Sequence, residues 1–134
     1  MLIAAARRSM KRAVHERVAP HGLTPQQFWT LVNLDEADGP SLSQIADRLR
    51  MDAPSTSRAV AQLLRRKLVV AEGDRGDRRR MRLRLTPQGR TKVAAVRSVA
   101  AELRSTEVHG LSRGEEEALR SLLRKIIANM DTLL

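Results

Sequence analysis

Three hydroxyl side chains and an arginine follow one another in residues 54–58 (Pro-Ser-Thr-Ser-Arg), where the sequence has the features of a helix start. Asp52 is a favoured N-cap residue, and a proline is favoured in the first turn after a cap. Arginine can bind guanine through two hydrogen bonds, serine and threonine can bind base edges or phosphates, and free amides at a helix start attract phosphate. The segment therefore has the chemistry to bind a nucleic acid, although a plain polar helix start would contain the same residue types.

A second group of cationic side chains lies further along the chain. Six arginines fall within residues 75–84, and only Asp74 and Asp77 offset them. A solvated charged strand normally mixes the two signs, so this excess differs from ordinary surface composition. Arginines on a protruding loop suit the narrow minor groove of DNA. The two groups together point to a duplex as the partner.

The overall composition fits the same partner. The 134 residues include 25 Lys and Arg against 15 Asp and Glu, and the net charge of +10 favours a polyanion, nucleic acid first and an anionic membrane surface second. One Phe and one Trp are the only aromatic residues, whereas single-strand binders usually stack bases on several aromatic rings. The composition thus favours double-stranded DNA.

Several other classes of function are disfavoured. The chain has no cysteine, which excludes disulfides and thiolate metal sites. His15, His21 and His109 lack the spacing of metal-binding helices, so we expect no metal and no cofactor. Ser55 and Thr56 have no histidine nearby in sequence, and we expect no enzymatic activity. The apolar runs are too short to span a bilayer and the N-terminal charge order is not that of a secretory signal, so we expect a cytoplasmic protein without a membrane partner.

Hydrophobic periodicity predicts where the elements lie. Apolar residues at helical spacing indicate helices over about residues 2–19, 25–37, 41–49, 52–67, 87–108 and 112–134, and a period of two indicates hairpin strands at 68–70 and 81–85. Three helix starts carry a capping box, in which a Ser or Thr and a following Gln or Glu bond each other's backbone amides: Thr24 with Gln27, Ser41 with Gln44, and Ser112 with Glu115.

The predicted elements form a recognisable arrangement. Residues 41–67 hold two short helices around the tight turn Arg50-Met51, which is helix-turn-helix geometry, and the basic hairpin follows as a wing. The fold class is therefore mainly α, a winged helix-turn-helix with a two-stranded β-wing and flanking N- and C-terminal helices. The apolar stripes place Leu42, Leu64 and Met81 among the inward-facing residues.

Residues 22–90 resemble the core of the MarR family (multiple-antibiotic-resistance regulators). The resemblance rests on five short motifs, which match the family's opening turn, the two helices of its helix-turn-helix, its wing and the helix after the wing: Gly22–Gln27, Leu42–Leu49, Ser55–Arg58, Asp74–Arg79 and Leu83–Gly89. In three places the sequence departs from the family. Arg50 and Lys67 replace glycines that end helices, so each is expected in a left-handed conformation, and Ala71 replaces a common strand arginine.

The resemblance implies roles for particular parts of the chain. Asp77 would brace Arg79, the wing arginine that reaches the minor groove, and the first and last helices would form a dimer. Family members often bind a small anionic or aromatic molecule between the dimer helices and the DNA-binding lobe. Residues that would line such a pocket, or would simply be core and surface, are Arg12, His15, His21 and Trp29.

These observations give one prediction for the chain. We expect a single domain over residues 1–134, with a DNA-binding lobe at 22–90 and dimerisation helices at 1–21 and 91–134. It would be a homodimeric repressor on a pseudo-palindromic operator, with a possible small anionic or phenolic effector. A non-specific architectural DNA-binding protein and an accessory protein of an enzyme are the alternatives. The expected DNA-binding residues are Ser41, Pro54, Ser55, Thr56, Ser57, Arg58, Gln62, Arg75, Asp77, Arg78, Arg79 and Arg80.

Overall fold

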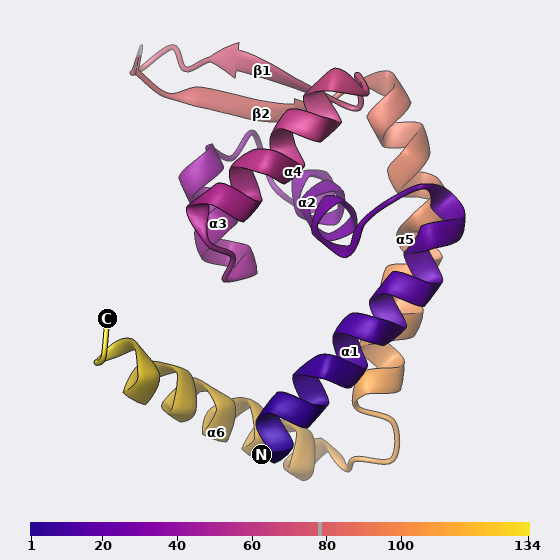
Figure 1. Cartoon of the computed structure of the whole chain (residues 1–134), viewed down its shortest axis with the longest axis vertical. Helices are drawn as coiled ribbons and strands as arrows, with labels where there is room; N and C mark the ends of the chain where they lie inside the picture. The colour runs from indigo at the N-terminus through magenta and orange to yellow at the C-terminus, as the bar shows by residue number, and fades with distance from the viewer. Residues whose placement is uncertain (78) are drawn as a thin grey trace. The chain divides into compact units, whose positions relative to one another are not determined.

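The computed structural model describes residues 1–77 and 79–134. The chain divides into two compact units, Met1–Ala101 and Glu102–Leu134. The mainly α winged helix-turn-helix prediction is confirmed. The elements of Figure 1 are α1 (Leu2–Val18), η1, a single 3-10 turn (Ala19–His21), α2 (Pro25–Glu36), α3 (Leu42–Leu49), α4 (Ala53–Arg65), β1 (Val69–Gly73), β2 (Met81–Leu85), α5 (Pro87–Glu107) and α6 (Arg113–Asp131).

The helix starts follow the capping residues in the sequence. In each capping box both reciprocal hydrogen bonds are formed, which satisfies backbone amides that a helix start would otherwise leave without partners. The predicted capping boxes are therefore confirmed. In each box the hydroxyl of the cap residue accepts a hydrogen bond from the backbone amide of the third residue after it. The distances are 3.1 Å from Gln27 to Thr24, 3.2 Å from Gln44 to Ser41, and 3.1 Å from Glu115 to Ser112.

Two helices end at residues with left-handed backbone conformations. Arg50, after α3, has a φ of 51°, and Lys67, after α4, has a φ of 58°. Glycine adopts this region without cost, whereas a residue with a Cβ is strained there. The expectation drawn from the missing glycines is therefore confirmed, and the tight turns that separate α3, α4 and β1 are made by these two residues.

The core of the first unit forms around α2, which contacts α1, α3, α4 and β2. Figure 1 shows α2 nearly end-on with α3 and α4 beside it. Phe28 and Leu31 of α2, Ile45 of α3, Leu63 of α4 and Val96 of α5 are completely buried. Their burial fixes α3 and α4 on α2 and so sets the geometry of the helix-turn-helix.

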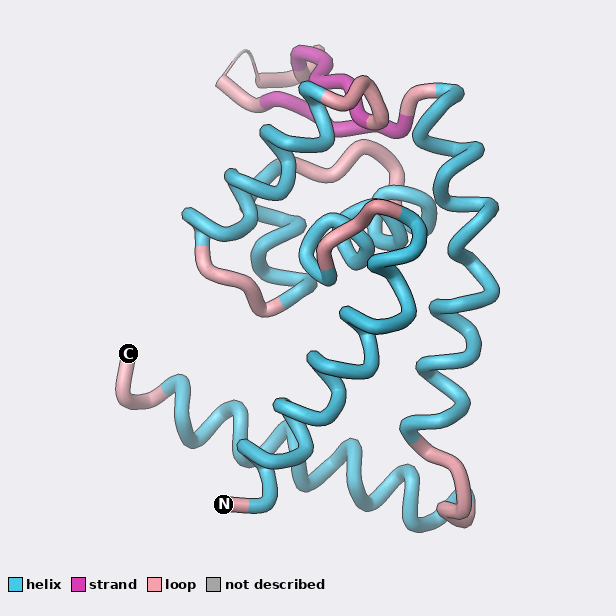
Figure 2. Tube along the Cα trace, turned by 45° about the vertical axis from the view of Figure 1, so that its right-hand side comes forward, coloured by secondary structure: helices cyan, strands magenta, loops and turns pink. Residues whose placement is uncertain are grey.

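The strands form an antiparallel ribbon that follows α4 (Figure 2). Val69 lies opposite Leu85 and Gly73 opposite Met81, so β1 starts one residue later than predicted and continues to Gly73. The Leu83 amide donates a hydrogen bond of 2.9 Å to the Pro40 carbonyl. The loop between α2 and α3 therefore runs beside β2, and the base of the wing is held against the helical lobe.

Three apolar residues that were predicted to face inward are exposed instead. Met81 is 49% exposed, and it lies opposite Gly73, which has no side chain to pack against it, at the tip end of the ribbon. Leu42 and Leu64, at the edges of the apolar stripes of α3 and α4, are 37% and 36% exposed. The centre of each stripe was predicted correctly, and its edge was not.

The second unit contains α6, whose apolar stripe is exposed along its length. No residue of α6 is buried. The stripe comprises Leu119, Leu122, Leu123, Ile126, Ile127 and Met130. Within the described ranges, no helix has both the length and the apolarity needed to cross a membrane.

Candidate nucleic-acid interface

The start of α4 is shaped by one carboxylate. Asp52 accepts hydrogen bonds from the Ser55 backbone amide at 2.7 Å and from the Ser55 hydroxyl at 2.8 Å. These two bonds hold the pKa of Asp52 below its usual value of 3.8. The cap therefore stays ionised at neutral pH, and it fixes Ser55 in the first turn. Arg58 reaches back to the Ser55 hydroxyl at 3.5 Å.

Several predicted DNA-binding residues share an open face at the start of α4. Pro54, Ser57 and Arg58 are exposed, and Ser55 is half-buried. Ser41, the half-buried cap of α3, has its hydroxyl 3.2 Å from that of Ser43. These positions leave hydroxyl and guanidinium groups accessible at the first turns of both helices of the motif.

Thr56 was predicted to contact DNA, but the structure places its side chain in the core. Its side chain is 0% exposed, and its hydroxyl donates to the Asp52 carbonyl at 2.9 Å. Thr56 shares helical spacing with Ala59, Val60 and Leu63, so the apolar period of α4 itself could have placed it in the core. Its side chain belongs to the packing of α4, and we remove it from the interface.

Gln62 also has a role inside the lobe. Its side-chain oxygen accepts a hydrogen bond of 2.8 Å from the buried Gln27 amide. Arg66 donates to the Gly22 carbonyl at 2.8 Å and to the Gln27 side-chain oxygen at 3.3 Å. This network links α4 to the start of α2. Long-range pairings of this kind leave no periodic signal in the sequence.

The wing turn is held by short hydrogen bonds to its two aspartates. The Asp77 carboxylate accepts from the Arg79 backbone amide at 2.9 Å, and the Asp74 carboxylate accepts from the Gly76 amide at 2.9 Å. Asp77 thus fixes the backbone from which Arg79 projects. Arg75, Arg79 and Arg80 are exposed, whereas Arg78, another predicted contact, lies outside the described residues.

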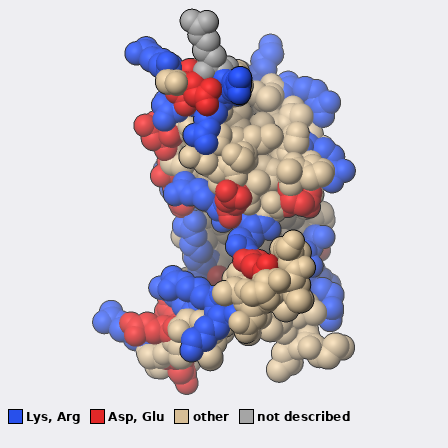
Figure 3. Space-filling model, turned by 90° about the vertical axis from the view of Figure 1, so that its left-hand side faces the viewer, with Lys and Arg blue, Asp and Glu red and all other residues tan. Residues whose placement is uncertain are grey.

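Figure 3 shows basic side chains at the wing end of this face, with acidic side chains among them. Arg84 differs from the other wing arginines that the structure describes, because it donates to Asp38 at 2.7 Å and to Glu72 at 3.0 Å. Counting arginines therefore overstates the charge that the wing can offer to a phosphate backbone.

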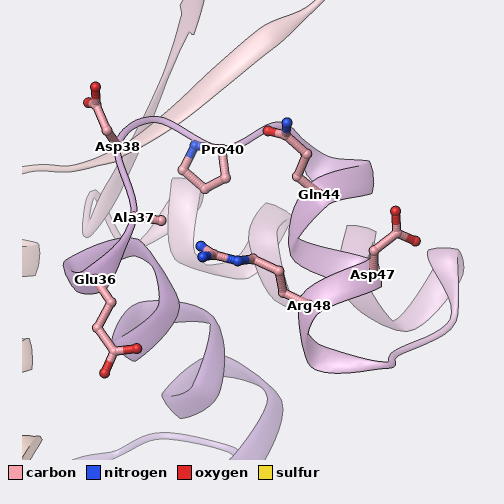
Figure 4. Close-up of a pocket in the computed structure, with 7 residues that line it drawn as sticks. All are labelled: Glu36, Ala37, Asp38, Pro40, Gln44, Asp47 and Arg48. Carbon is pink, nitrogen blue, oxygen red and sulfur yellow. The ribbon is translucent and has the colours of Figure 1, made fainter.

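The predicted ligand residues lie in the first unit but are not among the residues that line a hollow beside α3. Arg12 and His15 are exposed on α1, His21 is half-buried in η1, and half-buried Trp29 packs edge-on against Phe28 with ring centroids 4.7 Å apart. This hollow, of 460 Å³, lies between the end of α2 and α3, and Arg48 extends across it in Figure 4. It is lined by Glu36, Ala37, Asp38, Pro40, Gln44, Asp47 and Arg48.

Sequence reasoning did not single out Asn33, which lies one helical turn after Trp29 on α2. It is 9% exposed, and its side-chain oxygen has no hydrogen-bond partner among the described residues. Buried acceptors are nearly always satisfied, so an unpaired one is a reason to look for a water or a ligand. A mid-helix asparagine within an apolar stripe is the signal that the sequence offered.

Comparisons with known proteins agree with this architecture. Residues 21–80, which include the helix-turn-helix and most of the wing, match the MarR family model. The chain resembles a probable transcriptional regulator from Pseudomonas aeruginosa, with 31% identity, a TM-score of 0.72, and coverage of 92% of this chain and 96% of that one.

Two further structures connect the fold to regulation. S. aureus MepR, solved as a complex with DNA, is 28% identical, with a TM-score of 0.86 and coverage of 96% of this chain and 94% of that one. Bordetella bronchiseptica BpsR, whose DNA binding is regulated by 6-hydroxynicotinic acid, is 27% identical, with a TM-score of 0.79 and coverage of 93% and 95%. The capped α4 start, the Asp77-braced wing and these matches together establish that the chain belongs to the MarR family of DNA-binding transcriptional regulators.

Proposed function

We propose that this protein is a homodimeric repressor that binds a pseudo-palindromic operator and acts without catalysis. The observation that carries the proposal is the pairing of an open, capped α4 start with a wing whose Asp77 fixes the backbone of Arg79. A helix N-terminus of this kind fits the major groove, and an arginine on a projecting turn fits the minor groove.

The two elements would read DNA in different ways. Ser55, Ser57 and Arg58 offer hydrogen bonds to base edges, which specify sequence, while Ser41 offers one to a phosphate. Arg79 leads the wing contacts with the minor groove and the backbone. The complete proposed set is Ser41, Pro54, Ser55, Ser57, Arg58 and Gln62 with the wing residues Arg75, Asp77, Arg78, Arg79 and Arg80.

The exposed apolar stripe of α6 supports a dimer. A contiguous exposed apolar stripe promotes aggregation in a monomer and is typical of a surface that packs against a partner. Leu2, Ile3 and Met10 of α1 are exposed apolar residues as well. We therefore assign residues 1–21 and 91–134 to dimerisation, with about 2,000 Å² or more of total buried area. Two-fold symmetry would then present two helix-turn-helix lobes (residues 22–90) to two half-sites.

A small effector is a second part of the proposal. The regulation of BpsR by 6-hydroxynicotinic acid makes an anionic or phenolic ligand the first candidate. Arg12, His15 and His21 supply cationic or hydrogen-bonding groups. The Asn33 side-chain oxygen, which has no hydrogen-bond partner in the described part of the chain, lies one helical turn from Trp29. Because Trp29 is the only tryptophan, its fluorescence should change with any ligand that releases operator DNA. A releasing ligand that leaves Trp29 emission unchanged would place the site elsewhere.

The experiment that tests the function is selection of bound fragments from sheared genomic DNA, followed by footprinting and transcription from the selected promoter. We expect recovery of one or a few palindromic sites, protection over both half-sites, and reduced transcription when protein is added. Equal recovery of random and genomic fragments would support the architectural alternative, and increased transcription would assign activation.

A further inference from the structure

Arg84 lies between carboxylates from two other segments of the first unit. Its Nη1 donates to Asp38, in the loop between α2 and α3, at 2.7 Å, and its Nε donates to Glu72 of β1 at 3.0 Å. We call the Asp38, Glu72 and Arg84 side chains the wing clamp. The arginine is 37% exposed and Asp38 is 84% exposed, so the clamp lies at the surface and not in the core.

The backbone arrangement explains why these groups meet. The Leu83 amide bonds the Pro40 carbonyl on one side of β2, and β1 pairs with the other side. Glu72 lies opposite Arg82 and so is the diagonal neighbour of Arg84, within reach of a long side chain. The guanidinium thus joins three neighbouring stretches of backbone at the base of the wing.

Gly39 leaves room for this guanidinium. Its φ is +55°, and a Cβ at that position would lie 3.1 Å from Nη2 and 3.2 Å from Cζ of Arg84. Both the backbone conformation and the available space therefore favour glycine beside the clamp. Gly39 therefore lets the loop lie against the Arg84 guanidinium.

Electrostatics hold the clamp in its charged form. The hydrogen bond and the charge of Arg84 lower the pKa of Asp38 from its usual 3.8, and the charge of Arg82 adds to this effect. At neutral pH both members of the Asp38–Arg84 pair are ionised. An isolated surface ion pair contributes little, but a guanidinium shared by two carboxylates has the geometry in which such pairs matter.

We propose that Arg84 is a positioning residue, which sets the angle of the wing on the helix-turn-helix lobe through Asp38 and Glu72 instead of binding DNA. The inference rests on the proposed function and deepens it. Arg79 lies five positions before Arg84 in the chain, which is at most about 17 Å of extended chain. A tilt of about 10° at the clamp would move the tip by about 3 Å, more than a contact to a groove tolerates.

The effect of Asp38→Asn on DNA affinity distinguishes a positioning role for Arg84 from a direct DNA contact, because the two roles predict changes in opposite directions. Asp38→Asn removes a negative charge, so long-range electrostatics alone would tighten DNA binding. Loss of the clamp instead weakens operator binding, by about two- to fivefold per half-site. Arg84→Gln should give a similar loss with the salt slope of the wild type, because no phosphate contact disappears. The double variant should be no weaker than Arg84→Gln alone. Asp47→Asn, which removes an exposed carboxylate of α3 outside the clamp, is the matched control and should not weaken binding.

A second measurement tests the clamp without DNA. The native chain has no cysteine, so Ser43→Cys on α3 and Met81→Cys on the wing, both outside the proposed DNA-binding set, provide unique sites for spin labels. The label-to-label distance distribution should broaden in Arg84→Gln and in Asp38→Asn but not in Asp47→Asn. If the distance distribution broadens in these variants but the protein binds no duplex, the positioning role of Arg84 stands and the proposed function is overturned. An unchanged distribution, together with tighter binding by Asp38→Asn and a reduced salt slope in Arg84→Gln, would overturn the clamp and make Arg84 a DNA contact.

Discussion

At the scale of single residues, charge alone is a poor guide to what an arginine does. Arg58 stands on the open face of α4, Arg79 projects from a turn fixed by Asp77, and Arg84 is held by two carboxylates. Under the proposed function, the first specifies sequence, the second adds affinity, and the third orients the wing. Their hydrogen-bond partners, which the sequence does not display, make the difference.

Arg58→Ala and Arg79→Ala should therefore weaken DNA binding in different ways. Loss of Arg58 should cost about 1–3 kcal/mol per half-site and relax the preference at one base pair. Loss of Arg79 should weaken binding to operator and scrambled duplexes alike and lower the salt slope by about one per lost phosphate contact. Titrations of both duplexes across a salt series separate the two effects. If the two variants exchanged these behaviours, the assignment of helix and wing would be reversed.

The Asp52 cap should make the stability of the lobe depend on pH. Because folding lowers the pKa of Asp52 from 3.8, its contribution is present above that value and is lost as the pH falls through the folded pKa. The difference in unfolding free energy between wild type and Asp52→Ala should therefore be largest near neutral pH and shrink below about 3.8. Urea titrations at a series of pH values measure this difference, and Glu117→Ala on α6 is a control without a cap. A difference that grows with acidification would contradict the cap.

At the scale of elements, the sequence specified the starts of helices better than their packing. Thr24, Ser41 and Ser112 could be recognised because a capping box is a local pattern with its own hydrogen bonds. The burial of Thr56 follows from the period of α4, but its hydroxyl makes it resemble a contact residue. The Gln27–Gln62 bond joins residues 35 positions apart, so no local rule reveals it.

The first turn of α5 packs closely against the backbone at the base of the wing, and this packing depends on Gly89. A Cβ there would lie 1.9 Å from the Leu68 carbonyl oxygen, and this contact is with backbone that cannot rotate away. Gly89→Ala should destabilise the protein by about 1–3 kcal/mol or more through overpacking, despite the better helix propensity of alanine. Chemical denaturation gives the value. Gly114→Ala in α6, where the nearest atom to the new Cβ is 4.0 Å away, is the control, and equal behaviour of the two variants would contradict the packing account.

At the scale of the whole molecule, the proposal depends on a surface that a single chain leaves uncovered. Ile126→Glu or Leu122→Glu would place a carboxylate in the apolar stripe of α6, while Lys125→Glu changes the charge on the same helix outside the stripe. The first two should lower the dimer fraction, make thermal stability depend more steeply on concentration, and weaken operator binding. Sedimentation equilibrium and DNA titration test this. A stable monomeric Ile126→Glu that binds operator as tightly as wild type would exclude the dimer.

The central claim is that the α4 start and the wing bind one duplex sequence in preference to others. The most direct test is the ratio of dissociation constants for a selected genomic site and a scrambled duplex of equal length, measured with the wild-type protein near physiological salt. We predict a ratio of about 1,000 or more, with binding to both duplexes weakening as salt rises. A ratio near one at every salt concentration would contradict the account and leave a basic protein that binds DNA through its charge alone.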